Sequence, residues 1–257
     1  MHRNAIGLFF SILTSILTTT VDAKAISLVV TAEHMPPYQI IDKEHIDGYS
    51  VEIIQQVLHK ANIDYSFIPM NWDRAYGFVQ KKENTVLLSV ARTPDRESLF
   101  HWLFKINSAL KTSIWTTKNH NNEINSLSEI TTEMIAEVRN SFNHTMLSNY
   151  PNITPKNLIL TTDKKQTIAL VAKQRADFML VNEDVLNWRL KSLKFSKSNF
   201  KKVVELETSS NDLYIAANKN TSPLLINKMI TAYQKMLTDG SIATIRKKWF
   251  GEKSNNK

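Results

Sequence analysis

The sequence predicts an α/β fold built as two lobes of similar size. Segments whose apolar residues repeat every second position are interleaved with segments that repeat every 3.6 positions, which is typical of strands alternating with helices. Two such series follow one another, separated by a polar stretch at 118–123. The chain of 257 residues is long enough for two lobes of about 110 residues each.

The first series begins with a strand at 26–31 and a turn at 35–38. Ser50 is expected to cap a helix that runs to about Ala61, because Val51, Ile54, Val57 and Leu58 share one face. A strand at 65–68 and a helix at 72–81 follow. The strand at 85–90 is apolar on both sides, so we expect it at the centre of a sheet.

The second series begins after the strand at 112–117, and the polar stretch 118–123 is expected to cross between the lobes. Ser126 and Glu129 have capping-box spacing. Strands are predicted at 134–138, 158–161 and 178–181, and helices near 143–149, 163–173 and 184–192. The strand at 213–217 should return the chain to the first lobe. Ser222 and Pro223 open a long helix that ends at Gly240, and a basic helix with Trp249 follows.

The N-terminus has the layout of a cleaved secretory signal peptide over 1–23. A polar start precedes an apolar run of about 13 residues, whereas a membrane span needs about 20, and Ala23 ends a stretch suited to cleavage. The expected location is therefore the periplasm. The predicted boundaries are lobe 1 over 24–116 and 217–257, and lobe 2 over 117–216.

The composition excludes several kinds of chemistry. The chain has no cysteine, so thiolate metal sites and cysteine nucleophiles are excluded. No dinucleotide or phosphate-binding glycine loop, metal-binding histidine spacing or serine nucleophile elbow occurs. We expect no cofactor, no metal and no catalytic residue. The net charge of +8 suits a basic surface or the steering of an anionic ligand, and export argues against nucleic acid as a partner.

The run 89–96, with the sequence SVARTPDR, holds the best candidate site. It directly follows the central strand. Thr93 can cap a short helix and Pro94 suits the first helical position. The exposed amides of a helix start attract anions, and Arg96 adds a planar fork of donors that matches a carboxylate. A capped surface helix with solvated arginines is the alternative.

An ordered set of short motifs resembles the family 3 extracellular solute-binding proteins, which are the polar amino-acid binding components of ABC importers. The motifs are PPY at 36–38, GYSVEI at 48–53, Trp72, TPDR at 93–96, RADF at 175–178, DG at 239–240 and KWF at 248–250. The run 91–96 followed by FHW at 100–102 is similar to a divergent branch of the family. The resemblance covers nearly all of the chain after the leader.

The resemblance implies a type II periplasmic fold that closes like a hinge on a small ligand. Arg96 would then hold the ligand carboxylate. The other ligand-binding residues implied are Thr93, Ser89, Ala91, Trp72, Tyr38 and Met35 in the first lobe and Ser141, Phe142 and Asn182 in the second. The partners would be a small molecule and an ABC permease, and a monomer is expected.

Three positions depart from the family pattern. Met35 replaces a stacking aromatic residue, and Asn140-Ser141 replaces a glycine-containing turn, although asparagine tolerates a positive φ. Asn182 stands where amino-acid binders place an aspartate for the ligand ammonium, and a buried ammonium needs a counter-charge. Either Glu183, Glu33 or Asp73 supplies that charge, or the ligand is not a standard α-amino acid.

The sequence leaves three functions open. The first is a binding protein that presents its closed form to a permease; the second is a stand-alone sensory protein. The third is an enzyme on the same fold, similar to periplasmic cyclohexadienyl dehydratases, with Glu183 as its acid. We predict a binding protein rather than an enzyme. Arg74, Arg92 and Arg139, expected near the cleft, favour an anionic ligand.

Overall fold

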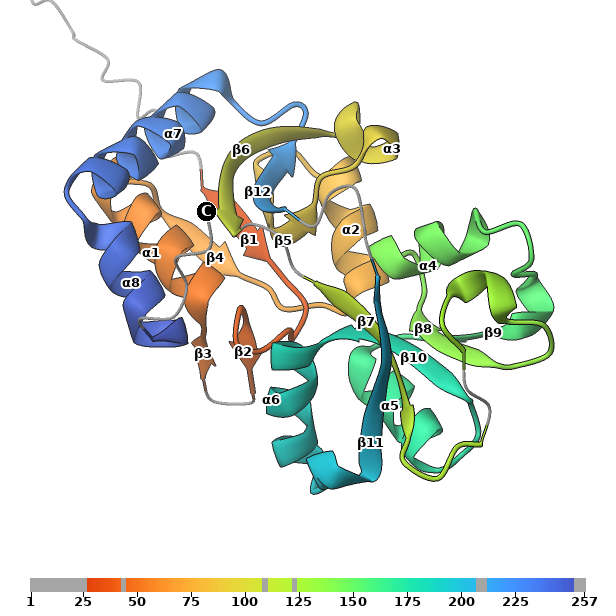
Figure 1. Ribbon diagram of the computed structural model, residues 1–257. Coiled ribbons are helices and arrows are strands. Elements are labelled where there is room, and N and C mark those ends of the chain that lie inside the picture. The colour runs from red at the N-terminus through yellow and green to blue at the C-terminus, as the bar shows by residue number, and fades with distance from the viewer. Residues whose placement is uncertain (1–26, 43–44, 108–110, 122–123, 207–211, 252–257) are drawn as a thin grey trace, which may run out of the picture.

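The computed structural model describes residues 27–42, 45–107, 111–121, 124–206 and 212–251. The chain forms two α/β lobes lying side by side, each built around its own five-stranded sheet (Figure 1). The predicted leader at 1–23 lies outside the described residues. Within the described ranges, no helix has both the length and the apolar character needed to cross a membrane.

The first sheet has the strand order β4-β1-β5-β12-β6. Its strands are β1 (Leu28–Thr31), β4 (Tyr65–Phe67), β5 (Thr85–Ala91), β6 (Phe100–Asn107) and β12 (Leu213–Asn218). Its helices are α1 (Tyr49–Ala61), α2 (Trp72–Lys81), α3 (Pro94–Glu97), α7 (Pro223–Thr238) and α8 (Ser241–Phe250), and a small hairpin joins β2 (Ile40–Ile41) to β3 (Ile46–Asp47). β5 lies at the centre, as predicted.

The second sheet has the order β11-β7-β10-β8-β9. Its strands are β7 (Thr112–Thr117), β8 (Ile135–Val138), β9 (Leu158–Thr161), β10 (Phe178–Asn182) and β11 (Phe200–Leu206). Its helices are α4 (Phe142–Ser148), α5 (Lys164–Ala172) and α6 (Glu183–Leu193), with 3-10 turns at Leu127–Glu129, Pro155–Asn157 and Lys197–Asn199.

The chain crosses between the sheets before β7 and again before β12. β6 and β12 pair with each other in the first sheet, whereas β7 pairs with β10 and β11 in the second. The expected crossing at 118–123 is therefore wrong, because this stretch follows β7 within the second lobe. The predicted boundaries at 116/117 and 216/217 fall inside β7 and β12, which each lie whole in one sheet.

Each sheet is covered on both faces, which explains why its central strands are continuously apolar. Side chains of a strand point alternately to opposite faces. In β5, Val86 and Leu88 join the core that contains α1 and α7, whereas Leu87 and Val90 join the core beneath α2. Burial on both faces leaves only the ends of the strands and the surface between the lobes for polar function.

Besides the short β2 and β3, two strands of the large sheets were not predicted from the sequence. β6 alternates in burial at its start, but the pattern breaks at Leu103 and Phe104, which are both buried, and the pairing with β12 shifts register along the strand. β11 lies at the sheet edge and carries Lys201, Lys202 and Glu205. Register shifts and charged edge residues both weaken the period-2 signal.

The predicted side-chain caps of two helices are wrong. Ser50 lies inside α1, which begins at Tyr49 after Gly48, and its hydroxyl is buried against another strand instead. Ser126 makes no side-chain cap bond, and Glu129 accepts from the Asn125 N–H rather than from the N-cap residue. The Ser50 hydroxyl contacts Ser89 of β5 instead, and the Ser126 hydroxyl contacts the neighbouring Ser128.

Candidate ligand-binding site

A cavity of about 130 Å³ lies between the two lobes, a size that suits a small molecule. Its wall in the first lobe is formed by Glu33, His34, Met35, Trp72, Ser89, Ala91, Arg96 and Leu213. Its wall in the second lobe is formed by Thr112, Glu137, Val138, Ser141, Phe142, Asn143, Lys164, Val181, Asn182, Val185 and Arg189. Crevices beyond strand ends, between lobes, are where α/β folds place ligands.

Arg96 is the main cationic group of the first lobe at this cavity. Its side chain is 5% exposed, and its guanidinium carbon lies 5.4 Å from the Trp72 ring centre and 5.2 Å from that of Tyr76. It donates to the carbonyls of Ala91 at 3.4 Å and Asn140 at 3.2 Å. Burial lowers the pKa of Arg96 below its usual value, but a guanidinium stays charged at neutral pH.

Arg96 forms no ion pair with any carboxylate in the described part of the chain. The carbonyls of Ala91 and Asn140 accept hydrogen bonds from the Arg96 guanidinium, and the Trp72 and Tyr76 rings lie close to it. None of these groups carries a negative charge. A buried charge without a counter-charge is costly. An anionic group on a ligand would remove that cost, and the planar fork of donors suits a carboxylate.

Ser89 is held by a buried hydrogen-bond network beneath the cavity floor. Gln39 donates from Nε2 to the Ser89 hydroxyl, and the Ser50 hydroxyl lies 2.8 Å from the same oxygen. Ser89 has a φ of 57°, a left-handed conformation that is uncommon for serine. The network explains why Ser50 is buried in α1 rather than capping it, and it fixes the backbone where β5 meets the cavity.

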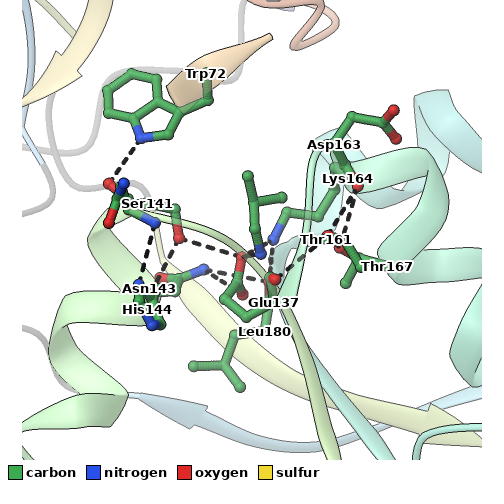
Figure 2. Close-up of polar contacts among 12 residues, drawn as sticks. Trp72, Glu137, Ser141, Asn143, His144, Thr161, Asp163, Lys164, Thr167 and Leu180 are labelled. Atoms are coloured by element: carbon green, nitrogen blue, oxygen red, sulfur yellow. Dashed lines mark hydrogen bonds and ion pairs between the residues drawn. The ribbon is translucent and has the colours of Figure 1, made fainter. Parts of the chain in front are cut away.

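In the second lobe, the turn between β8 and α4 faces Arg96. Asn140 has a φ of 55°, as its tolerance of positive φ allowed us to expect. Ser141 is the N-cap of α4, with its hydroxyl oxygen accepting from the His144 N–H at 3.1 Å. Ser141 also donates to Glu137 Oε1 at 3.3 Å, as Figure 2 shows.

Several hydrogen bonds join the lobes around the cavity. Trp72 Nε1 donates to the Asn140 carbonyl at 2.7 Å, the same oxygen that Arg96 contacts. Asn140 Nδ2 donates to Asp73 Oδ1 at 2.5 Å. On the other side of the cavity wall, Arg189 of α6 donates to the carbonyl of His34. The lobes are therefore held together by the chain's own atoms on both sides.

Asn182 lines the cavity, but its amide is used within the protein. Its Oδ1 accepts from the Asp184 and Val185 N–H groups, which caps α6, and its Nδ2 donates to the Lys111 carbonyl at 3.1 Å. Of the three carboxylates considered as a replacement for the missing aspartate, Glu33 alone is a cavity residue. Glu183 pairs with Lys197 and Lys202, and Asp73 contacts Asn140.

The structure brings most of the predicted residues to one cavity. Arg96, Ser89, Ala91, Trp72, Met35, Ser141, Phe142 and Asn182 line it. Tyr38 and Thr93 do not. The Tyr38 ring is 1% exposed and packs against Tyr49 and Phe250 behind the cavity wall, and Thr93 is the N-cap residue of α3 without a side-chain cap bond.

His34, Glu137, Lys164 and Arg189 also line the cavity, although the sequence did not indicate them. Three arginines that were expected near the cleft lie elsewhere. Arg74 and Arg139 are exposed, and Arg92 pairs with Glu97 at 2.5 Å. Glu137 could have been noticed, because it is a charged residue inside the buried strand IAEV. Arg189 gives no such signal, since an arginine on a helix is usually solvated.

No cluster of three histidine, cysteine, aspartate or glutamate side chains that could hold a metal occurs in the ranges that the structure describes. Burial and the nearby Arg189 guanidinium together lower the pKa of His34 to about 4. Its imidazole is thus neutral at pH 7, and Nδ1 accepts from the Ile41 N–H at 2.9 Å.

Comparison with solved structures shows the fold. An ancestral arginine-binding protein bound to glutamine has a TM-score of 0.76 at 20% identity, covering 88% of this chain and 98% of its own. ArtJ of Geobacillus stearothermophilus, an arginine-, lysine- and histidine-binding protein, has a TM-score of 0.74 at 18% identity, covering 90% and 97%. A histidine kinase sensor domain with similarity to periplasmic binding proteins has 0.77 at 18% identity, covering 88% and 96%.

Comparison of sequences shows the family. The L-cystine-binding protein TcyA of Bacillus subtilis (strain 168) is 23% identical over 243 residues, which cover 92% of this chain and 85% of TcyA. The model of the bacterial extracellular solute-binding proteins, family 3, matches residues 28–252. The predicted two-lobed α/β fold is confirmed, and these relatives are solute-binding proteins, not enzymes. The chain belongs to the family 3 bacterial extracellular solute-binding proteins.

Proposed function

We propose that this protein captures a small amino-acid-like molecule through its carboxylate and delivers it to an ABC importer at the inner membrane. The observation that carries the proposal is the buried guanidinium of Arg96 at the cavity, which has no carboxylate partner in the described ranges. A ligand carboxylate supplies the missing negative charge in fork geometry. Ser89, Ala91 and Trp72 line the cavity from the same lobe, and Ser141 faces them from the other.

The ligand names of the relatives support the same chemical class. TcyA is named for L-cystine, and the similar solved structures are named for arginine, lysine, histidine or glutamine. All of these molecules share an α-carboxylate and an α-ammonium group and differ in the side chain. A carboxylate contact at Arg96 is compatible with any of them, so the contact alone selects the class and not the molecule.

The proposal is tested by thermal unfolding with the twenty amino acids and simple organic acids. A ligand at 100 times its Kd stabilises the protein by about 2.7 kcal/mol, which raises Tm by several degrees. Arg96→Ala should abolish this shift, whereas Arg92→Ala, which removes a neighbouring, half-buried arginine that does not line the cavity, should leave it unchanged. An Arg96→Ala variant that folds and keeps the full shift would contradict the carboxylate contact.

A sensory role is a second candidate, because a histidine kinase sensor domain shares the fold. The two roles differ in the partner of the ligand-bound form. Pull-down with the liganded protein from solubilised inner membranes should recover a permease with its ATPase if the protein serves an importer. Recovery of a signalling protein instead would favour the sensor.

A further inference from the structure

A second set of charged groups lines the cavity, apart from Arg96. Glu33 follows β1 in the first lobe, Lys164 opens α5, and Arg189 lies on α6 in the second lobe. No carboxylate–cation pair within 4.0 Å links Glu33 to either cation in the described ranges. Glu33 and Arg189 have no ion pair in the described ranges, and both line the cavity, so both are available to a ligand.

The carboxylate of Glu33 has no hydrogen-bond donor among the described residues. Burial raises the pKa of Glu33 to about 7, although Arg189 and Lys164 both act to lower it. The ionised carboxylate is therefore under-stabilised within the protein, and a positively charged group on a ligand would favour it.

Lys164 is fixed in the cavity wall by a buried carboxylate. Its ammonium donates to Glu137 Oε1 at 2.5 Å and to the Leu180 carbonyl at 3.1 Å, so two of its three donors are used. Glu137 is fully buried and also accepts from the Val138 N–H and from Asn143 Nδ2. Figure 2 shows this network, in which Glu137 is saturated and Lys164 keeps one donor.

Arg189 adds a second cation beside Lys164. Its side chain is 5% exposed, one guanidinium nitrogen donates to the His34 carbonyl, and Nε is buried without a hydrogen-bond partner. A buried guanidinium donor left without an acceptor is costly. Arg189 lines the cavity and has no ion pair in the described ranges, so an anionic oxygen in the cavity would supply the counter-charge of its guanidinium.

The charges along the cavity wall sum to one positive charge. Among the described residues that line it, the cations are Arg96, Lys164 and Arg189, and the carboxylates are Glu33 and Glu137. A ligand that matches this wall carries one negative charge in excess and has both a cationic and two anionic groups. A neutral or cationic amino acid would leave a buried cation uncompensated.

We propose that the ligand is an amino-dicarboxylate, a small molecule with one ammonium and two carboxylate groups. The first carboxylate binds Arg96, which is where this inference rests on the proposed function. The ammonium binds Glu33, which replaces the aspartate absent at Asn182. The second carboxylate binds Lys164 and Arg189, and Glu137 positions Lys164 for that contact.

The first experiment compares matched acids and amides by isothermal titration calorimetry at pH 8 with the full chain. L-glutamate and L-aspartate should bind about 10- to 100-fold more tightly than L-glutamine and L-asparagine, the effect of one hydrogen bond between charged groups. L-arginine and L-lysine should bind more weakly than the amides. Tighter binding of an amide or a basic amino acid would overturn the inference.

The second experiment tests whether Lys164 causes the preference for acids over amides. The single change Lys164→Met strands the buried Glu137, which can unfold the protein, so the variant to use is Glu137→Gln with Lys164→Met. It should reduce the acid-over-amide preference at least about fivefold, because one charged contact to the second carboxylate is lost. Lys165→Met, which changes the neighbouring exposed lysine, should keep the preference.

The two proposals fail in distinguishable ways. If the double variant folds and retains the full preference for acids, the second subsite is wrong while binding through Arg96 stands. If no amino acid binds the parent protein, or if Arg96→Ala binds them all unchanged, the proposed function itself is wrong.

Discussion

Glu33 and His34 are neighbours at the end of β1, and burial shifts the protonation of both toward the neutral form. The pKa of Glu33 rises from 4.5 to about 7, and that of His34 falls from 6.5 to about 4. The two shifts affect stability with opposite signs. Between pH 4.5 and 7 the folded chain holds a proton on Glu33 that the unfolded chain has released, so Glu33 makes stability fall as pH rises.

Glu33→Gln should therefore stabilise the protein in a pH-dependent way. The gain in unfolding free energy should be small below pH 4.5, grow through the interval to pH 7 and level above it at on the order of 3 kcal/mol. Urea denaturation at pH 4 to 8 of the variant and the parent measures the difference, in which the opposite effect of His34 cancels because both proteins retain it. A gain that does not vary with pH would contradict the shifted pKa.

At the residue scale, the sequence could indicate Arg96 because a local pattern surrounds it: a buried strand, a helix start and a proline in the first turn. Nothing local distinguishes Arg189 from a solvated arginine. Its burial depends on the second lobe meeting His34, in the segment that follows β1 of the first lobe, and the two residues are 155 positions apart. Residues of this kind become visible only once the lobes are placed.

At the element scale, the turn between β8 and α4 concentrates contacts on one residue. The Asn140 carbonyl accepts from Trp72 and Arg96, and its backbone has a φ of 55°. Left-handed geometry costs most residues about 1–2 kcal/mol, less for asparagine and least for glycine. The side-chain bond to Asp73 is exposed and therefore contributes little to stability.

Asn140→Ala should destabilise the protein by about 1 kcal/mol or more, whereas Asn140→Gly should cost less, because glycine adopts the same φ without strain. The carbonyl that faces Arg96 is present in both variants. Denaturant unfolding of the two variants side by side measures the difference. Equal destabilisation would assign the effect to the lost Asp73 bond instead.

Elements were predictable where one physical signal dominated. β7 and β9 were predicted with their exact ends, and β5 was placed correctly at the sheet centre because burial on both faces makes it largely apolar. β6 and β11 were not predicted, because a register shift in β6 and charged edge residues in β11 weaken the alternation of apolar and polar residues. The predicted caps at Ser50 and Ser126 were wrong because the Ser50 hydroxyl contacts Ser89 of another strand and the Ser126 hydroxyl contacts the nearby Ser128.

At the scale of the whole molecule, hydrogen bonds between the two lobes hold them against each other around the cavity. Trp72 and Arg96 hold one side through Asn140, and Arg189 holds the other through the His34 carbonyl. The sequence indicated two lobes but not their relative placement, since the crossings lie next to β7 and β12 rather than in the most polar stretch. Under the proposed function, the lobes open and close in an equilibrium that ligand contacts with both lobes shift.

Trp72→Phe keeps an aromatic ring but removes the donor to Asn140, so it should lower the ratio of closed to open molecules about fivefold, the effect of one neutral hydrogen bond of about 1 kcal/mol. Because the chain has no cysteine, Lys156→Cys and Lys228→Cys, both at exposed positions of opposite lobes, give specific sites for distance measurement by fluorescence transfer.

Trp188→Phe, which changes an exposed tryptophan of α6, is the control and should leave the distance distribution as in the parent. If Trp72→Phe gives the same distribution as this control, the indole bond does not contribute to closure.

Because Trp72 and Arg96 both donate to the Asn140 carbonyl, the ligand-free protein and the ligand-bound protein can both adopt the shut form and compete for the same transporter. Some of the hydrogen bonds between the lobes join peptide oxygens to indole or guanidinium donors of the protein itself, with no ligand atom involved. A transporter that recognises only the shut shape would then meet unloaded carriers as well as loaded ones. Productive uptake would depend on how far an incoming anion at Arg96 lengthens the lifetime of the shut form beyond what these bonds already provide.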